Sequence, residues 1–188
     1  MSLNSYQGEG AIICGSAPCV KEDFEIVRSK RKNHIVIGIN EAIWAIKCDM
    51  LMTYHFAEID YFLSKSLNKE LEIHTSDTYP GHTNKKITGR WSVKGGATSA
   101  IDAVQICQQM GFDEIILVGC PMMGGDGYFH SQNAKETEEG CPRFGNKENI
   151  ELIQKHKSKL KDLAGDLNFD TVYSVSGFTA EIFGKPNL

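Results

Sequence analysis

The chain has 188 residues, of which 41% are hydrophobic, and this length and composition suit one compact domain with a core of ordinary size. Its formal net charge of -4 and its scattered basic residues argue against nucleic-acid binding, because phosphate contacts need concentrated lysine and arginine. No apolar run reaches the ~18–20 residues of a membrane-spanning helix, and no signal-peptide pattern opens the chain. We therefore expect a single cytoplasmic domain over residues 1–188, without a membrane span.

Short apolar strands alternate with helices in the first half of the chain. We predict strands at 11–15, 34–40 and 49–55, because each is rich in β-branched or other apolar residues. Helices are predicted at 21–32, 41–47 and 57–69, and a further strand at 71–76. The segment 77–91 is polar and rich in turn formers, so it is interpreted as a loop.

The second half contains the clearest unit, a helix at 97–110 that stops at Gly111 and leads into a buried strand at 114–119. After a long loop, 120–145, we predict an amphipathic helix over 146–167, a strand at 171–176 and a short C-terminal helix. Alternating helices and nearly continuous apolar strands predict an α/β fold, a Rossmann-like three-layer sandwich with a mainly parallel sheet. Ligands of such sheets bind beyond the carboxyl ends of the strands.

Six cysteines raise the question of disulfides or a metal site. Cys14, Cys107 and Cys120 lie inside apolar patterns, so we expect core positions and reduced thiols. A zinc site at Cys14 and Cys19 would need two further ligands. Cys19 stands at a helix start, where a lowered pKa could make it reactive, but a structural or incidental cysteine is the favoured interpretation of both residues.

Two glycine-bordered helix starts could accept an anion. Gly15, Ser16, Ala17 and Pro18 form a tight turn before the first helix, where backbone N–H groups and the helix dipole can meet a phosphate. This turn lacks the third glycine of a dinucleotide fingerprint and the Gly-Lys-Ser/Thr of a P-loop, so it does not predict NAD binding or ATPase chemistry. "KGGATS" (94–99) forms the second start, in which Thr98 and Ser99 either contact an anion or only cap the helix.

The loop "GCPMMGGDGYFHSQN" (119–133) follows the strongest predicted strand, where active-site loops of α/β proteins lie. His130 could act as a general base, since an imidazole with a pKa near ~6.5 can take a proton near neutral pH. The hydroxyl of Tyr128 could steady a departing phosphate. The alternative is a solvent-exposed polar loop.

These stretches resemble the bacterial CMP-sialic-acid-dependent sialyltransferases of glycosyltransferase family 42. The shared features are a turn after the first strand ("GSAPC" here), an asparagine that ends the second strand (Asn40 in "GIN") and the helix and strand of "ATSAIDAVQICQQMGFDEIILVG". The motility accessory factor and archaeal pterin-pyrophosphokinase-like proteins look similar too. The likeness covers about residues 10–183. Asn146 stands where the sialyltransferases have a histidine before the last long helix.

The resemblance implies a metal-independent glycosyltransferase with a CMP-sialic-acid-like donor, a glycan or protein acceptor and no required cofactor. It implies that the turn 15–18 meets the nucleotide phosphates, that Asn40 lies near the ribose or base, and that Thr98 and Ser99 also contact the nucleotide. His130 would serve as the base of an inverting displacement.

Two other functions remain open at this point. One is a Mg-dependent pyrophosphokinase-like phosphotransferase, in which Asp126 would help to hold Mg²⁺ between phosphates. The other is a non-catalytic protein that binds a nucleotide or another small ligand. The segments 77–95 and 120–145 are long enough to supply a lid, and a neighbouring subunit of a homo-oligomer could complete the site.

Overall fold

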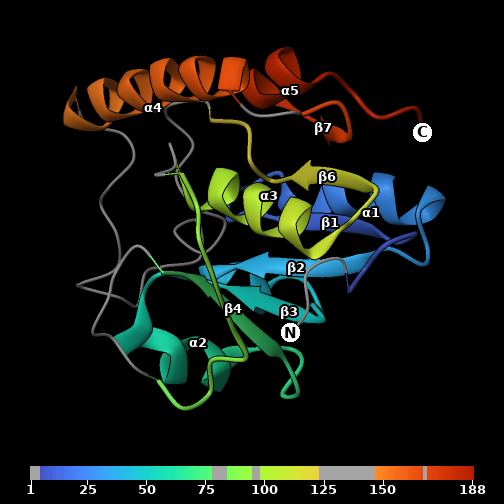
Figure 1. Cartoon of the computed structure of the whole chain (residues 1–188), viewed down its shortest axis with the longest axis vertical. Helices are drawn as coiled ribbons and strands as arrows, with labels where there is room; N and C mark the ends of the chain where they lie inside the picture. Colours follow the sequence, from blue (N-terminus) through green and yellow to red (C-terminus); the bar gives the residue numbers. More distant parts are fainter. Residues whose placement is uncertain (1–4, 78–83, 95–97, 123–146, 167–168) are drawn as a thin grey trace.

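The computed structural model describes residues 5–77, 84–94, 98–122, 147–166 and 169–188. Within these ranges seven strands form one sheet in the order β5-β4-β3-β2-β1-β6-β7, and every neighbouring pair is parallel (Figure 1). The strands are β1 (Gly10–Cys14), β2 (Ile35–Ile39), β3 (Met50–Met52), β4 (Glu72–Ser76), β5 (Gly89–Trp91), β6 (Glu114–Val118) and β7 (Val172–Ser174). The strand order reverses between β1 and β6, which is the topological switch point of the sheet.

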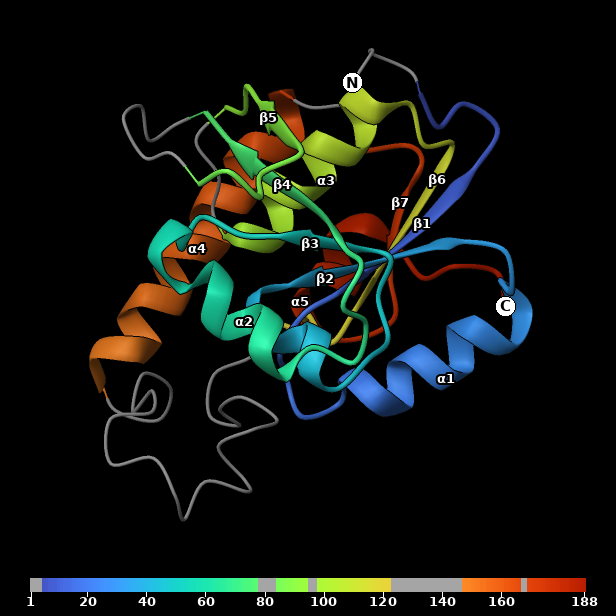
Figure 2. The same ribbon diagram turned by 90° about the horizontal axis from the view of Figure 1, so that it is seen from below.

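Helices cover both faces of this sheet. On one face lie α1 (Val20–Lys30), the 3-10 helix η1 (Asn40–Trp44) and α2 (Ile59–Lys65), which follows a short 3-10 turn, η2 (Phe56–Glu58). On the other lie α3 (Ser99–Met110), α4 (Lys147–Asp166) and α5 (Gly177–Phe183). Figure 2 shows α1 and α2 on one side of the strands and α3 on the other. The predicted Rossmann-like three-layer α/β sandwich is therefore confirmed.

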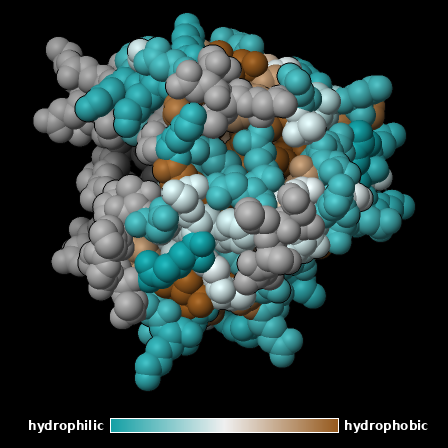
Figure 3. Space-filling view, viewed as in Figure 1, coloured by the Kyte–Doolittle hydropathy of each residue, from teal (hydrophilic) through white to brown (hydrophobic). Residues whose placement is uncertain are grey.

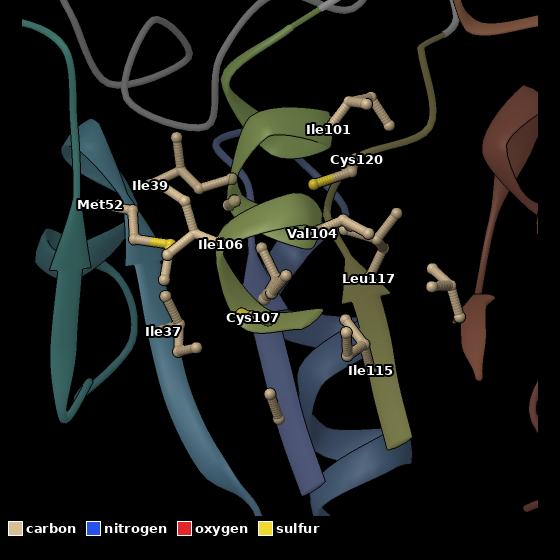
Figure 4. Packing of buried hydrophobic residues seen from close by; sticks show 14 of the residues in the cluster. Ile37, Ile39, Met52, Ile101, Val104, Ile106, Cys107, Ile115, Leu117 and Cys120 are labelled. Carbon is tan, nitrogen blue, oxygen red and sulfur yellow. The ribbon is translucent and has the colours of Figure 1, made fainter. Parts of the chain in front are cut away.

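The two-sided cover explains the nearly continuous apolar strands. Successive residues of β1 point to opposite faces, so Ile12 packs with α1 and α2 while Ile13 packs with α3. Figure 4 shows Val104 and Ile106 of α3 directed at the sheet, with Ile106 towards Ile39 and Met52. This packing places the first turn of α3 over the carboxyl ends of the central strands.

Local sequence fixes both ends of α3. Thr98, with φ -155° and ψ 165°, lies outside the helical region and is the N-cap, and its hydroxyl oxygen accepts a hydrogen bond from the N–H of Ile101 at 3.4 Å. Gly111 ends the helix in the left-handed conformation, with φ 91°. The helix start that carries Thr98 and Ser99 is therefore set in place by its own capping residues.

Most predicted elements are confirmed, and the differences are local. The segment 77–91 is not only a loop, because Gly89–Trp91 pairs with β4 as an edge strand. Three residues are too few to show an alternating pattern, and Arg90 in the middle is exposed. The predicted helix at 41–47 is the 3-10 helix η1. Among the described residues, none of the helices is both long and apolar enough to cross a membrane.

Candidate functional site

The turn after β1 is packed directly against the end of β6. The N–H of Gly15 donates to the carbonyl of Val118 at 2.8 Å, and that of Ala17 donates to the carbonyl of Gly119 at 3.1 Å. A Cβ atom on Gly15 would collide with the Gly119 carbonyl oxygen and with Sγ of Cys120. The protein itself therefore uses two of the amides that were expected to meet a phosphate, and the close approach requires glycine at position 15.

A buried carboxylate also lies at this switch point. Asp23, in the first turn of α1, accepts hydrogen bonds from the N–H of Gly119 at 3.0 Å and from the hydroxyl of Ser176 at 2.8 Å. Its negative charge offsets the attraction that the helix N-terminus would exert on a phosphate. The turn 15–18 is thus less suited to anion binding than its sequence indicates.

Asp23 also corrects the prediction for Cys19. Burial, followed by the charge of Asp23, raises the pKa of the Cys19 thiol to about 11, so the proposed lowered pKa was wrong. The core positions predicted for Cys14, Cys107 and Cys120 are confirmed, since all three are buried. The five cysteines within the described residues are free thiols.

Hydrogen bonds of Asn40 and of its neighbour Ile39 link the ends of three strands. Asn40 follows β2 in the left-handed conformation, with φ 50°, which an asparagine tolerates better than most residues. Its Oδ1 accepts a hydrogen bond of 2.7 Å from the hydroxyl of Thr53 at the end of β3. The hydroxyl of Ser16 donates to the carbonyl of Ile39 at 3.5 Å. Left-handed residues that are held by their surroundings often mark functional sites.

A small hollow opens between the ends of β3 and β4 and the first turns of α3. The empty space over it, about 180 Å³, includes open solvent, and its lining is Met52, Thr53, Tyr54, His74, Thr75, Ser99, Ala103 and Ile106. The space between these side chains is too narrow even for a water molecule, so a nucleotide would have to lie over the hollow and not inside it. In Figure 3 the described part of the face in view is largely hydrophilic, with small hydrophobic patches between the hydrophilic side chains.

His74 lines the hollow, but both of its ring nitrogens face protein partners. Nδ1 accepts a hydrogen bond of 3.2 Å from the indole N–H of Trp91, and Nε2 lies 3.2 Å from a carboxylate oxygen of Glu72. Burial lowers the pKa of His74, which favours the neutral imidazole with its hydrogen on Nε2. His74 therefore stabilises the wall of the hollow by joining β4 to β5.

Asp102 is the residue of this region that the sequence reasoning missed. It lies in the first turn of α3, and its side chain is buried, with 8% relative exposure. Burial raises the pKa of its carboxyl to about 6, although the Tyr54 side chain and the charge of Lys159 act in the opposite direction. A carboxyl with such a pKa can exchange a proton near neutral pH. The available signal was a pair of polar residues, Asp102 and Gln105, inside an otherwise apolar helix face.

No family model and no curated protein sequence matches the chain. The function is therefore inferred from the chemistry and geometry of the site residues. Within the described ranges, no three His, Cys, Asp or Glu side chains are grouped so that they could hold a metal ion. The residues expected to supply the reaction chemistry, Asp126, Tyr128 and His130, lie outside the described residues, so their roles stay predictions.

The residues expected to contact the nucleotide, in contrast, all lie within the described part of the structure. The turn 15–18, Asn40, Thr98 and Ser99 lie at the same carboxyl edge of the sheet, at the ends of β1 and β2 and the start of α3. Ser99 lines the hollow. Thr98 is the N-cap of α3, which was one of the two roles expected for it from the sequence. Whether any of them binds a nucleotide stays a prediction.

Proposed function

We propose that the chain is a transferase that binds a nucleotide-activated sugar, a CMP-sialic-acid-like donor, at the carboxyl edge of its sheet. The observation that carries the proposal is a line of contacts across this edge. Ser16 bonds to the end of β2, Asn40 bonds to Thr53, and Thr53 and Ser99 line the same hollow. The family resemblance implied Ser16, Asn40 and Ser99 as nucleotide contacts, and the fold gathers these three residues in one region.

The start of α3 is the helix start to which we assign the donor phosphate, because its hydroxyl residue Ser99 lines the hollow. At the α1 start, the amides of Gly15 and Ala17 are engaged and Asp23 is close by. At the α3 start, the N–H groups of Ile101 and Asp102 donate to Thr98, so a phosphate would be bound by the hydroxyl of Ser99 and the amides before Ile101. We therefore assign the donor phosphate to α3, and the nucleoside to the region of Asn40 and Thr53.

The proposed transfer itself depends on the segment that follows β6. His130 would take the proton of the acceptor hydroxyl, and Tyr128 would stabilise the departing nucleotide phosphate. The bond between the sugar and the phosphate would break as the bond to the acceptor oxygen forms. No metal ion takes part in this mechanism.

Binding of CMP, CDP, UMP and UDP, measured by thermal shift and calorimetry, tests the proposal. A nucleotide at about one hundred times its Kd should stabilise the fold by about 2.7 kcal/mol. Asn40→Ala and Ser99→Ala should each weaken binding about tenfold, whereas Ser29→Ala, on the exposed side of α1, should leave it unchanged. The absence of binding by every one of these nucleotides would overturn the proposal.

Activity assays separate the remaining functions. Transfer from a CMP-activated sugar in the presence of EDTA, lost in His130→Ala, supports the glycosyltransferase. Turnover of ATP that requires Mg²⁺ and is lost in Asp126→Asn would instead support the pyrophosphokinase-like enzyme. Nucleotide binding without either turnover would identify a non-catalytic binding protein.

A further inference from the structure

The first residues after β6 include two in the left-handed backbone conformation. Gly119 has a φ of 62° and Met122 a φ of 49°. This conformation is unstrained for glycine but costs free energy in a residue with a long side chain such as Met122. Strained residues of this kind persist only where the surrounding structure holds them, and they gather at functional sites. The neighbours of residues 119–122 therefore have to supply contacts that hold the chain in this course.

Asp23 of α1 supplies the first of these contacts. Its side chain has 6% relative exposure, and its Oδ2 accepts hydrogen bonds from the N–H of Gly119 at 3.0 Å and from the hydroxyl of Ser176 at 2.8 Å. A carboxylate is a stronger acceptor of such bonds than a neutral group. Ser176 directly precedes α5, so one carboxyl group joins the end of β6 to the C-terminal part of the chain.

The first turn of α5 supplies the other contacts. The hydroxyl of Thr179 donates to the carbonyl of Cys120 at 2.8 Å. The N–H of Phe178 donates to the carbonyl of Pro121, also at 2.8 Å. The Thr179 oxygen lies 2.8 Å from that of Ser174, and both side chains are buried. Since the Cys120 carbonyl can only accept, the hydroxyl of Ser174 is the donor to Thr179, and the bonds run from β7 through α5 to the backbone after β6.

Gly177 allows α5 to approach residues 119–122 this closely. Its φ is 69°, and a Cβ atom there would collide with the carbonyl oxygen of Pro121. Three side chains, those of Asp23, Ser176 and Thr179, complete the contacts, and we call them the anchoring residues. They come from both ends of the chain and fix the point at which it continues beyond β6.

We propose that the anchoring residues are positioning residues of the transfer reaction, because they fix the start of the segment that carries Tyr128 and His130. This inference rests on the proposed function, which assigns the chemistry to these two residues, and both follow Met122 in the sequence. A misplacement of reacting groups by about 1 Å can lower a rate about a hundredfold. Loss of an anchoring contact therefore lowers kcat, whereas the donor nucleotide, assigned to α3 and Asn40, binds as before.

The first experiment tests the anchoring contacts in the protein without ligand, through hydrogen exchange of single amides. Thr179→Val keeps nearly the same shape but has no hydroxyl, so the N–H groups of Gly119 and Phe178 should exchange at least about tenfold faster, relative to the amides of β1, than in the wild type. Thr179→Ser keeps the hydroxyl and should behave like the wild type. Ile73→Val shortens a buried side chain of β4 and should leave this ratio unchanged. An unchanged ratio in Thr179→Val overturns the anchoring role.

The second experiment measures transfer from a CMP-activated sugar together with the affinity for CMP. In Thr179→Val and Asp23→Asn, kcat should fall at least about tenfold, while the Kd of CMP stays within about twofold of the wild type. Thr179→Ser should restore kcat. Ile73→Val should keep the wild-type kcat although its fold is less stable, which separates positioning from a general loss of stability. If Thr179→Val does not fold, Ser176→Ala, at a partly exposed side chain, takes its place in both experiments.

The outcomes separate this inference from the proposed function. An unchanged kcat in the anchoring variants, or an equal loss in Ile73→Val, overturns the positioning role and leaves the proposed function standing. If the wild type neither binds a nucleotide nor transfers a sugar, the proposed function falls and the role in transfer falls with it. The exchange rates then still decide whether the anchoring residues hold the chain after β6.

Discussion

Two carboxyl groups at opposite edges of the sheet have pKa values shifted in opposite directions. At the amino edge, Glu114 at the start of β6 accepts from Arg31 Nε at 2.8 Å and Nη2 at 3.1 Å, and it lies 2.6 Å from Nε2 of His34. The Arg31 hydrogen bonds, followed by that of His34, lower the pKa of Glu114. At the carboxyl edge, burial raises the pKa of Asp102.

The opposite pKa shifts mean that ionisation of Glu114 stabilises the native state, whereas ionisation of Asp102 destabilises it. The charge of Glu114 is compensated and joins α1, β2 and β6, so it stabilises the native state. The charge of Asp102 is poorly compensated, so its ionisation opposes folding. A carboxyl that weakens the fold at the ligand-binding edge of a Rossmann-like sheet is a candidate for function.

The largest expected effect is a stabilisation by Asp102→Asn at pH 7. A shift of about two pKa units corresponds to at most about 3 kcal/mol, which the neutral amide would recover. The folded-state pKa is raised, so the wild type loses this stability as the pH rises from about 4 to about 6. Urea unfolding should show almost no difference between the two proteins at pH 4 and the full difference at pH 7. If Asp102→Asn is instead less stable than the wild type at pH 7, the charge of Asp102 does not oppose folding and the two carboxyl groups do not differ in this way.

A smaller effect of opposite sign is expected for Glu114→Gln at the amino edge. We expect a destabilisation of about 1 kcal/mol at pH 7, modest because the ion pair is partly exposed to solvent. The folded-state pKa of Glu114 is lowered, so its contribution is present above the unfolded pKa and is lost as the pH falls. The same urea series should therefore show this difference shrinking below pH 4. A difference that grows in acid would contradict the assignment.

The smallest effect is expected for Thr98→Ala, which tests whether the α3 start serves the fold or the ligand. Loss of the cap should cost about 0.5 kcal/mol of stability, at the low end for N-caps because the hydrogen bond is long, at 3.4 Å. If Thr98 is only a cap, thermal shift with CMP should give an unchanged affinity. A tenfold loss of affinity would make Thr98 a nucleotide contact as well.

The sequence indicated the fold more completely than the site. β1 and β6 could be predicted because both are continuous apolar runs. The parallel sheet that they share with β2 has Asn40, directly after β2, at its carboxyl edge. The raised pKa of Asp102 could not be predicted, because the burial of one polar side chain depends on tertiary packing that the local sequence does not show. The pKa of Cys19 was predicted with the wrong sign because burial and the charge of Asp23 raise it, although the contact with Ser176 lowers it.

The pairing of β1 with β6 has a consequence for how the chain folds. β1 pairs with β2 over a short connection, but its other neighbour, β6, lies about 100 residues further along the sequence. During synthesis the first four strands can therefore assemble while one side of β1 is still an open edge, the kind of surface at which unfinished chains associate. Closing this edge is a long-range step, which makes the docking of β6 the slow event expected to limit the folding rate.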